Sequence, residues 1–194
     1  MPTRVVDNAD RTLLPLFINA AKELESEGVR AITTSCGFLA LFQKEMASAV
    51  NVPMFTSSLL QVPLAHQIIG ANKKVGIITA NSTALTKDHL RAVGIDDSIP
   101  VAIAGMEHQS DFREAIGENL TRPLVPEKVQ ASLVSVSEEL KKKENLGVIV
   151  LECTNLSPYA KAVQESVKLP VFDITTLCNF IYNTVLRRKF DGFL

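Results

Sequence analysis

Residues 29–38 read Val-Arg-Ala-Ile-Thr-Thr-Ser-Cys-Gly-Phe, and residues 146–155 read Leu-Gly-Val-Ile-Val-Leu-Glu-Cys-Thr-Asn. In each stretch a short apolar, β-branched run ends at a cysteine, and a helical pattern follows at once. A shift of 153 − 36 = 117 positions superimposes Cys36 on Cys153, and the match continues without a gap. The shift pairs Phe42 with Tyr159, Lys44 with Lys161, Val50 with Val167, Pro53 with Pro170, Phe55 with Phe172, Ser58 with Thr175 and Leu60 with Leu177. Two copies of one strand–cysteine–helix–strand–helix unit predict two similar halves, each presenting one thiol.

Between and around these copies, apolar strand patterns alternate with helical ones, as at residues 74–79 and in the helix that Pro126 opens. Such alternation indicates parallel sheets with right-handed crossovers. We therefore predict an α/β fold with two pseudosymmetric parallel-sheet lobes and a site in the cleft between them. The first lobe is expected to comprise residues 1–70 and 175–194, and the second residues 71–174.

The amino-terminal region is expected to hold a short strand near residues 4–7. A helix then follows from Asp10, a residue type that caps helices well, and ends at Gly28.

Composition narrows the class of protein. The 194 residues include 20 basic and 21 acidic side chains, and the basic ones are scattered, which argues against a nucleic-acid surface. Three cysteines, an odd number, favour reduced thiols over a secreted disulfide framework. No apolar run reaches the roughly 18 residues of a membrane helix, and the first residues do not resemble a signal peptide. We predict a cytoplasmic protein without membrane or nucleic-acid partners.

The two cysteines suggest the chemistry. Ligands of parallel α/β sheets bind beyond the carboxyl ends of the strands, where Cys36 and Cys153 are expected. A following helix amino terminus would lower the pKa of each thiol and favour the thiolate. Two such thiols facing one cleft could remove a proton from a carbon acid on one side and return it on the other. That reaction needs neither a metal nor an organic cofactor, and we predict none.

The segments Thr-Ser-Cys-Gly-Phe and Glu-Cys-Thr-Asn, with the loop Val-Gly-Ile-Ile-Thr-Ala-Asn-Ser-Thr, resemble the aspartate/glutamate/hydantoin racemase superfamily over about residues 10–185. The resemblance implies a pyridoxal-independent two-cysteine racemase that acts on a small carboxylate-bearing substrate and forms a homodimer. Cys36 and Cys153 match the two acid/base cysteines. Thr154 matches a threonine that helps to hold the substrate carboxylate, and Thr83 matches a loop threonine of the same pocket.

Some positions depart from the family pattern. Gly37-Phe38 replaces the usual Asn-Thr after the first cysteine, Asn155 stands where glutamate racemases have histidine, and Ala80 replaces the first loop threonine. The segment Cys-Thr-Asn-Leu-Ser-Pro also resembles the maleate isomerase branch. Three alternatives stay open: an amino-acid racemase, a cis–trans isomerase that uses a covalent cysteine adduct, and a non-catalytic ligand-binding remnant.

Members of the family begin with a strand and a polar turn, whereas here the first helix starts by about residue 11. We expect the chain to be truncated relative to the family and to expose a strand edge unless a second subunit covers it.

The remaining candidates are polar groups near the cysteines. Asn155, Asn81, Ser35 and Gly37 are expected to bind the substrate together with Thr154 and Thr83. Cys178 fits the apolar pattern of the last helix and is interpreted as structural. The roles of His108 and Glu152 stay open.

Overall fold

The structure is a computed structural model that describes residues 2–6, 8–116, 123–189 and 192. Its strands form two parallel sheets, one of two strands and one of four in the order β4-β3-β5-β6. The strands are β1 (Ile32–Thr33), β2 (Met54–Phe55), β3 (Lys74–Thr79), β4 (Val101–Gly105), β5 (Leu146–Leu151) and β6 (Val171–Phe172).

Helices connect the strands and cover the sheets. The α-helices are α1 (Pro2–Val6), α2 (Leu14–Ser26), α3 (Gln43–Ser48), α4 (Val62–Gln67), α5 (Lys87–Ala92), α6 (Ser110–Ile116), α7 (Pro126–Lys143), α8 (Ala160–Val167) and α9 (Ile174–Val185). Short 3-10 helices are η1 (Arg11–Leu13), η2 (Gly37–Phe42), η3 (Ser58–Gln61) and η4 (Thr154–Tyr159). The predicted parallel α/β fold is confirmed.

The internal repeat is visible in the strand register. Ile32 pairs with Met54 in the small sheet, and Ile149 pairs with Val171 in the large one, so both partners are shifted by 117 positions. The 3-10 helices η2 and η4, which follow the cysteines, obey the same shift at both ends. The two cysteine units therefore share one local fold.

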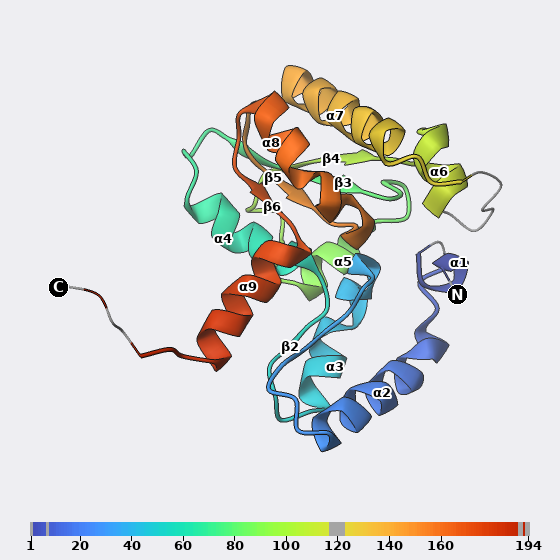
Figure 1. The fold of residues 1–194 in the computed structure, drawn as a ribbon, viewed down its shortest axis with the longest axis vertical. Coiled ribbons are helices and arrows are strands. Elements are labelled where there is room, and N and C mark those ends of the chain that lie inside the picture. Colours follow the sequence, from blue (N-terminus) through green and yellow to red (C-terminus); the bar gives the residue numbers. More distant parts are fainter. Residues whose placement is uncertain (1, 7, 117–122, 190–191, 193–194) are drawn as a thin grey trace.

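The four-stranded sheet separates two apolar cores. Because successive residues of a strand point to opposite faces, Ile77 and Val150 pack into a core shared with η2, η3, α4 and α5, whereas Ile78 and Ile149 pack beneath α7 and α8. Figure 1 shows α7 and α8 on one face of this sheet, with α4 and α5 on the other. The first core joins the small sheet and its helices to the large sheet.

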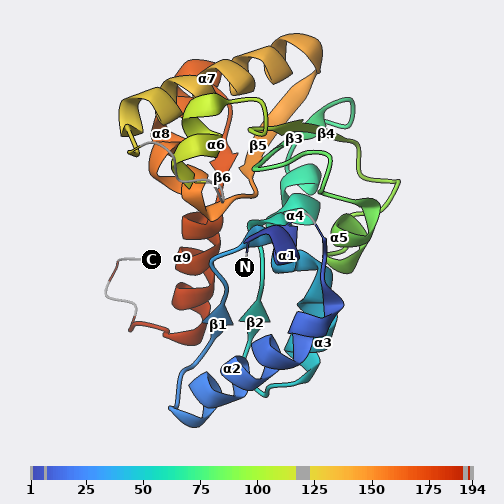
Figure 2. The same cartoon turned by 90° about the vertical axis from the view of Figure 1, so that its right-hand side faces the viewer.

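The two sheets lie in different parts of the molecule. Figure 2 shows β1 and β2 with α2 and α3 at one end, and the four-stranded sheet with α7 and α8 at the other. The predicted lobe boundaries stay a prediction; residues 1, 7, 117–122, 190–191 and 193–194 of those ranges lie outside the described residues.

Local signals fix several helix ends. The side chain of Asp10 accepts a hydrogen bond from the Thr12 N–H at 2.9 Å and so caps η1, which leads into α2. Gly28, at φ +85°, closes the turn after α2, where a side chain would be strained. The strand expected near residues 4–7 is wrong, because residues 2–6 form α1, while residue 7 lies outside the described residues.

The small sheet has an open edge. Among the described residues β1 pairs only with β2, whereas its repeat counterpart β5 lies between β3 and β6. The expected unpaired strand edge is therefore present, and its cover by a second subunit stays a prediction. Within the described part of the chain, none of the helices has the length and apolar character needed to cross a bilayer.

Candidate active site

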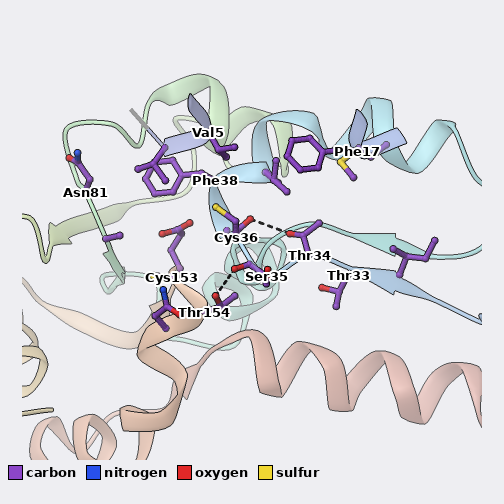
Figure 3. A pocket seen from close by; sticks show the side chains of 18 of the residues that line it. Val5, Phe17, Thr33, Thr34, Ser35, Cys36, Phe38, Asn81, Cys153 and Thr154 are labelled. Carbon is purple, nitrogen blue, oxygen red and sulfur yellow. Dashed lines mark hydrogen bonds between the residues drawn. The ribbon is translucent and has the colours of Figure 1, made fainter. Parts of the chain in front are cut away.

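Each cysteine lies where a strand of the repeat gives way to a 3-10 helix. Cys36 is the N-cap residue of η2 after β1, and Cys153 is the N-cap residue of η4 after β5. Both side chains line one cavity of about 710 Å³. Figure 3 shows Cys36, Ser35, Cys153 and Thr154 close together in this pocket. Both cysteines therefore lie at a single pocket, and their catalytic roles stay predictions.

The cavity has two chemically distinct parts. Around the cysteines its wall carries polar groups beside Phe38, whereas along β1 and the facing side of α2 it is mainly apolar. The apolar part is lined by Val5, Val6, Phe17, Ala20, Ala21, Leu24, Ile32, Leu39, Met46 and Met54. The polar part is therefore the place for chemistry on a small charged molecule.

Two hydroxyl groups tie the cysteine loops in place. The Thr154 Oγ1 donates to the Ser35 carbonyl at 2.7 Å and so joins loops that lie 119 residues apart. The Thr34 Oγ1 lies 3.1 Å from the Cys36 carbonyl and 2.6 Å from the Thr56 carbonyl, to which it donates. Figure 3 marks the Thr154–Ser35 and Thr34–Cys36 contacts. These bonds fix the backbone around both thiols.

Glu152, which precedes Cys153, is fully buried. Its Oε2 accepts a hydrogen bond from the Thr79 Oγ1 at 2.7 Å, whereas Oε1 has no hydrogen-bond partner in the described part of the chain. Burial raises the pKa of this carboxyl to about 7, although hydrogen bonds from the Thr79 side chain and the Ala80 N–H oppose the shift. A carboxyl group with this pKa is partly protonated and partly ionised near neutral pH.

The thiols do not have the lowered pKa expected at a helix amino terminus. Burial, with a smaller contribution from the Glu152 carboxylate, raises the pKa of Cys36 to about 11. Burial likewise raises the pKa of Cys153, and the charges of Glu152 and Cys36 add to that effect. Backbone N–H groups of η2 and η4 favour the thiolates, as expected, but burial outweighs them.

Most of the predicted binding residues meet at this pocket. Its lining includes Ser35, Gly37, Asn81, Thr154 and Asn155. Both the backbone and the side chain of Asn155 hydrogen-bond Cys153 and favour its thiolate. The substrate-binding roles of these five lining residues stay predictions.

Other candidates lie elsewhere. Thr83 is exposed and is not among the residues that line the pocket; its Oγ1 instead donates to the Asn81 Oδ1 at 2.7 Å. His108 is exposed and Cys178 is half-buried on α9, and neither is among the lining residues.

Among the lining residues missed from the sequence are three that follow β4. Glu107, Phe112 and Arg113 follow β4, and all three line the pocket. Glu107 accepts hydrogen bonds from the Ser82 N–H at 3.1 Å and from the Ser82 hydroxyl. The carboxyl ends of parallel strands meet at one edge of a sheet, so the position of Glu107 just after β4 was an available signal.

Among the described residues, no group of three or more His, Cys, Asp or Glu side chains is arranged to hold a metal ion. The prediction that the protein uses no cofactor stays a prediction.

The fold and the pocket define a two-sheet α/β protein with a pair of cysteines at equivalent points of an internal repeat. Residues 62–178 match the sequence profile of the family described as Asp/Glu/Hydantoin racemase. The chain belongs to this family, which confirms the resemblance. Cys153 lies inside the matched range and Cys36 before it.

Individual proteins carry different activities on this scaffold. The chain is 33% identical over 169 residues to dimethylsulfoniopropionate lyase 3 of Emiliania huxleyi, a match that covers 84% of this chain and 44% of that protein. An aspartate racemase homologue from Pyrococcus horikoshii has a similar structure, with a TM-score of 0.60 and 20% identity over 92% of this chain and 79% of the other. Unliganded arylmalonate decarboxylase gives a TM-score of 0.58 and 15% identity, over 90% and 76% of the two chains.

The chain spans about half the length of the curated relatives that it matches. These relatives are lyases, and the structural neighbours include racemases and a decarboxylase. An enzyme is therefore supported, whereas the expected isomerase activity is one of several reactions that this fold accommodates.

Proposed function

We propose that this protein is a cysteine-dependent enzyme that removes the α-proton of a small carboxylate and eliminates the substituent on the adjacent β-carbon. The observation that carries the proposal is the meeting of Cys36 and Cys153 at one pocket, at equivalent points of the repeat. A thiolate positioned at a carbon acid is a general base, and a second thiol can return a proton or assist the departure of a group.

The polar end of the pocket suits a carboxylate. Thr154 and Asn155 lie in η4, directly after Cys153, and place backbone and amide groups beside the thiol. The Thr154 hydroxyl donates to the Ser35 carbonyl and so holds this loop in place rather than donating to a ligand. Arg113 is the basic side chain among the described lining residues, and a guanidinium can bind a carboxylate through two parallel hydrogen bonds. In our proposal these groups hold the substrate carboxylate and thereby present its α-carbon to a cysteine.

The electrostatics favour a substrate that carries a positive charge. Both thiols have raised pKa values, and a buried carboxyl lies beside them. An acidic amino acid would add a further negative charge and disfavour the thiolate, whereas a bound cation would favour it. The sulfonium group of dimethylsulfoniopropionate, named as the substrate of the lyase relatives, has the required charge.

The proposed reaction on that substrate is a β-elimination. The thiolate takes the α-proton, so that the Cα–H bond breaks and an S–H bond forms. The electron pair of the Cα–H bond becomes the Cα–Cβ double bond, and the Cβ–S bond breaks with its electrons retained by sulfur. Acrylate and dimethyl sulfide leave, and the thiol returns its proton to solvent.

Racemisation is the second candidate. It is favoured by the repeat, which gives the two cysteines equivalent backbone settings at one pocket. The cis–trans isomerase would instead require a covalent adduct on one cysteine. The non-catalytic alternative predicts that neither thiol responds to a carboxylate ligand.

Headspace gas chromatography of dimethyl sulfide tests the proposal directly. The enzyme is incubated with dimethylsulfoniopropionate, and the wild type is compared with Cys36→Ser and Cys153→Ser, with Cys178→Ser as a control away from the pocket. We expect release by the wild type and the control and a loss of at least about a hundredfold in one or both pocket variants. Undiminished release in both pocket variants would refute the thiol mechanism.

A parallel incubation of aspartate and glutamate in D₂O distinguishes racemisation. If deuterium appears at the α-carbon of either amino acid and no dimethyl sulfide is released from the sulfonium substrate, the proposed elimination is wrong and racemisation is the supported function.

A further inference from the structure

The proposed reaction uses two thiols, yet the pocket that they line also contains a carboxylic acid. Glu152 is fully buried although it lines the cavity. Charged side chains are rarely buried without an ion-pair partner, and Glu152 has no such partner in the described residues. Its position therefore calls for an explanation other than packing.

The carboxyl group contacts both cysteine loops. Glu152 precedes Cys153 in the chain, and its side chain packs against Gly37, which follows Cys36. A Cβ atom built on Gly37 would lie 2.8 Å from the Glu152 Cδ and nearer still to Oε1. The absence of a side chain at Gly37 thus lets the carboxyl group lie beside the first cysteine loop.

The carboxyl group is also held firmly in this position. The Thr79 hydroxyl binds Oε2 at 2.7 Å, the Glu152 N–H donates to the Ile78 carbonyl at 2.8 Å, and the Ser58 Oγ lies 3.3 Å from the Glu152 carbonyl. These contacts come from β3 and η3. Oε1 is left without a hydrogen-bond partner in the described residues and faces the cysteine side of the pocket.

We propose that Glu152 is a positioning residue that restricts the buried site to a single negative charge. A thiolate then forms on Cys36 or Cys153 only while the Glu152 carboxyl is neutral. In that state the proton on Glu152 and the charge on sulfur coexist in the pocket, whereas an ionised carboxylate keeps both cysteines as thiols. The coupling between Glu152 and the thiols does not depend on the proposed function. Only the catalytic role of the thiolate rests on that function.

No other described charged group of the pocket is placed to control the charge of the two thiols as Glu152 is. The described ionisable side chains that share its pocket are the two cysteines, Glu107 and Arg113. Glu107 is bound to Ser82, and Arg113 is exposed. Glu152 is the carboxylate whose charge acts on both thiols.

Alkylation kinetics test the proposal without any substrate. Iodoacetamide reacts with thiolates, and mass spectrometry of the peptides gives a separate rate for each cysteine. Glu152→Gln keeps the size of the side chain and an acceptor for Thr79, but it cannot ionise. Glu107→Gln is the matched control, because it removes another carboxylate of the same pocket.

The expected result is that the alkylation rate of Glu152→Gln, divided by that of the wild type, depends on pH. With a pKa of about 7, the carboxyl group is neutral in roughly one molecule in eleven at pH 8. The Glu152→Gln protein should therefore react about tenfold faster than the wild type at pH 8 and at a similar rate at pH 6. The Glu107→Gln protein should react within about twofold of the wild type at both pH values. A general loosening of the fold would raise the ratio at both pH values and would contradict the proposal.

A second variant keeps the test decisive if Glu152→Gln does not fold. Thr79→Val removes the hydroxyl that favours the ionised carboxyl, so Glu152 stays neutral to higher pH. Alkylation at pH 8 should then be several-fold faster than in the wild type, again without a change at pH 6. Wild-type rates in the folded variants would overturn the proposal. Absence of dimethyl sulfide release, by contrast, would affect only the proposed function.

Discussion

Replacing Gly37 with alanine tests the close approach of the two cysteine loops. The added Cβ would lie 2.8 Å from the Glu152 Cδ and well inside 3.0 Å of both Oε1 and the backbone carbonyl oxygen of Glu152. The carbonyl oxygen belongs to a backbone fixed by the sheet, so it cannot swing aside. The new methyl group must therefore displace one of the two loops.

The size of the effect follows from this crowding. Inserting a carbon into a well-packed interior costs about 1–3 kcal/mol, and we expect Gly37→Ala to lower the free energy of unfolding by that amount. Gly70→Ala is the control, because a Cβ there has no neighbour within 4 Å. Its free energy of unfolding should change by less than about 1 kcal/mol, in either direction.

Urea unfolding followed by circular dichroism measures both variants. Peptide-level alkylation of Cys36 and Cys153 then reports whether the loops have separated, because more exposed thiols react faster. A Gly37→Ala protein with the stability of the wild type and unchanged alkylation of both cysteines would refute the packing of Glu152 against Gly37.

Three further results follow from individual groups. Because burial raises the pKa of Glu152 from 4.5 to about 7, the folded state binds more protons than the unfolded state between these values, and this group destabilises the protein as pH rises. The unfolding free energy of Glu152→Gln minus that of the wild type should therefore rise by about 2 kcal/mol between pH 5.5 and pH 8.5 in urea titrations; a difference that falls over this range would contradict this. Thr154→Val, which loses the 2.7 Å hydrogen bond to the Ser35 carbonyl, should lose about 1 kcal/mol of unfolding free energy, whereas Thr154→Ser should keep most of it. Asp173→Ala removes the α9 cap, which accepts from the Thr176 N–H at 2.8 Å, and should lower the thermal midpoint by an amount equivalent to about 1–2 kcal/mol; an unchanged midpoint would show that the cap adds little.

The repeat was the part of the fold that the sequence defined best. Because the two copies align without a gap, the shift that superimposes Cys36 on Cys153 also carries the observed pair Ile32–Met54 onto the observed pair Ile149–Val171. The amino-terminal residues lacked such an internal reference. The β-branched pair at Val5 suggested a strand, whereas residues 2–6 form a helix that contributes Val5 to a core cluster.

The electrostatics of the site could not be read from the sequence. Placing a cysteine before a helix indicates a lowered pKa, but the net effect depends on how deeply the surrounding chain buries the sulfur. That depth comes from elements distant in sequence, as does the contact between Glu152 and Gly37. For the same reason Glu152 was left undecided and Arg113 was missed, since both reach the pocket only through the assembled strand ends.

The most direct test of the two-thiol pocket is chemical cross-linking of its cysteines. A short thiol-bridging reagent such as dibromobimane is added to the folded protein, and the linked peptides are identified by mass spectrometry. The account predicts an intramolecular link between Cys36 and Cys153 that persists in Cys178→Ser and is lost in Cys36→Ser. Modification of both cysteines without any link between them, or a link from either one to Cys178, would contradict it.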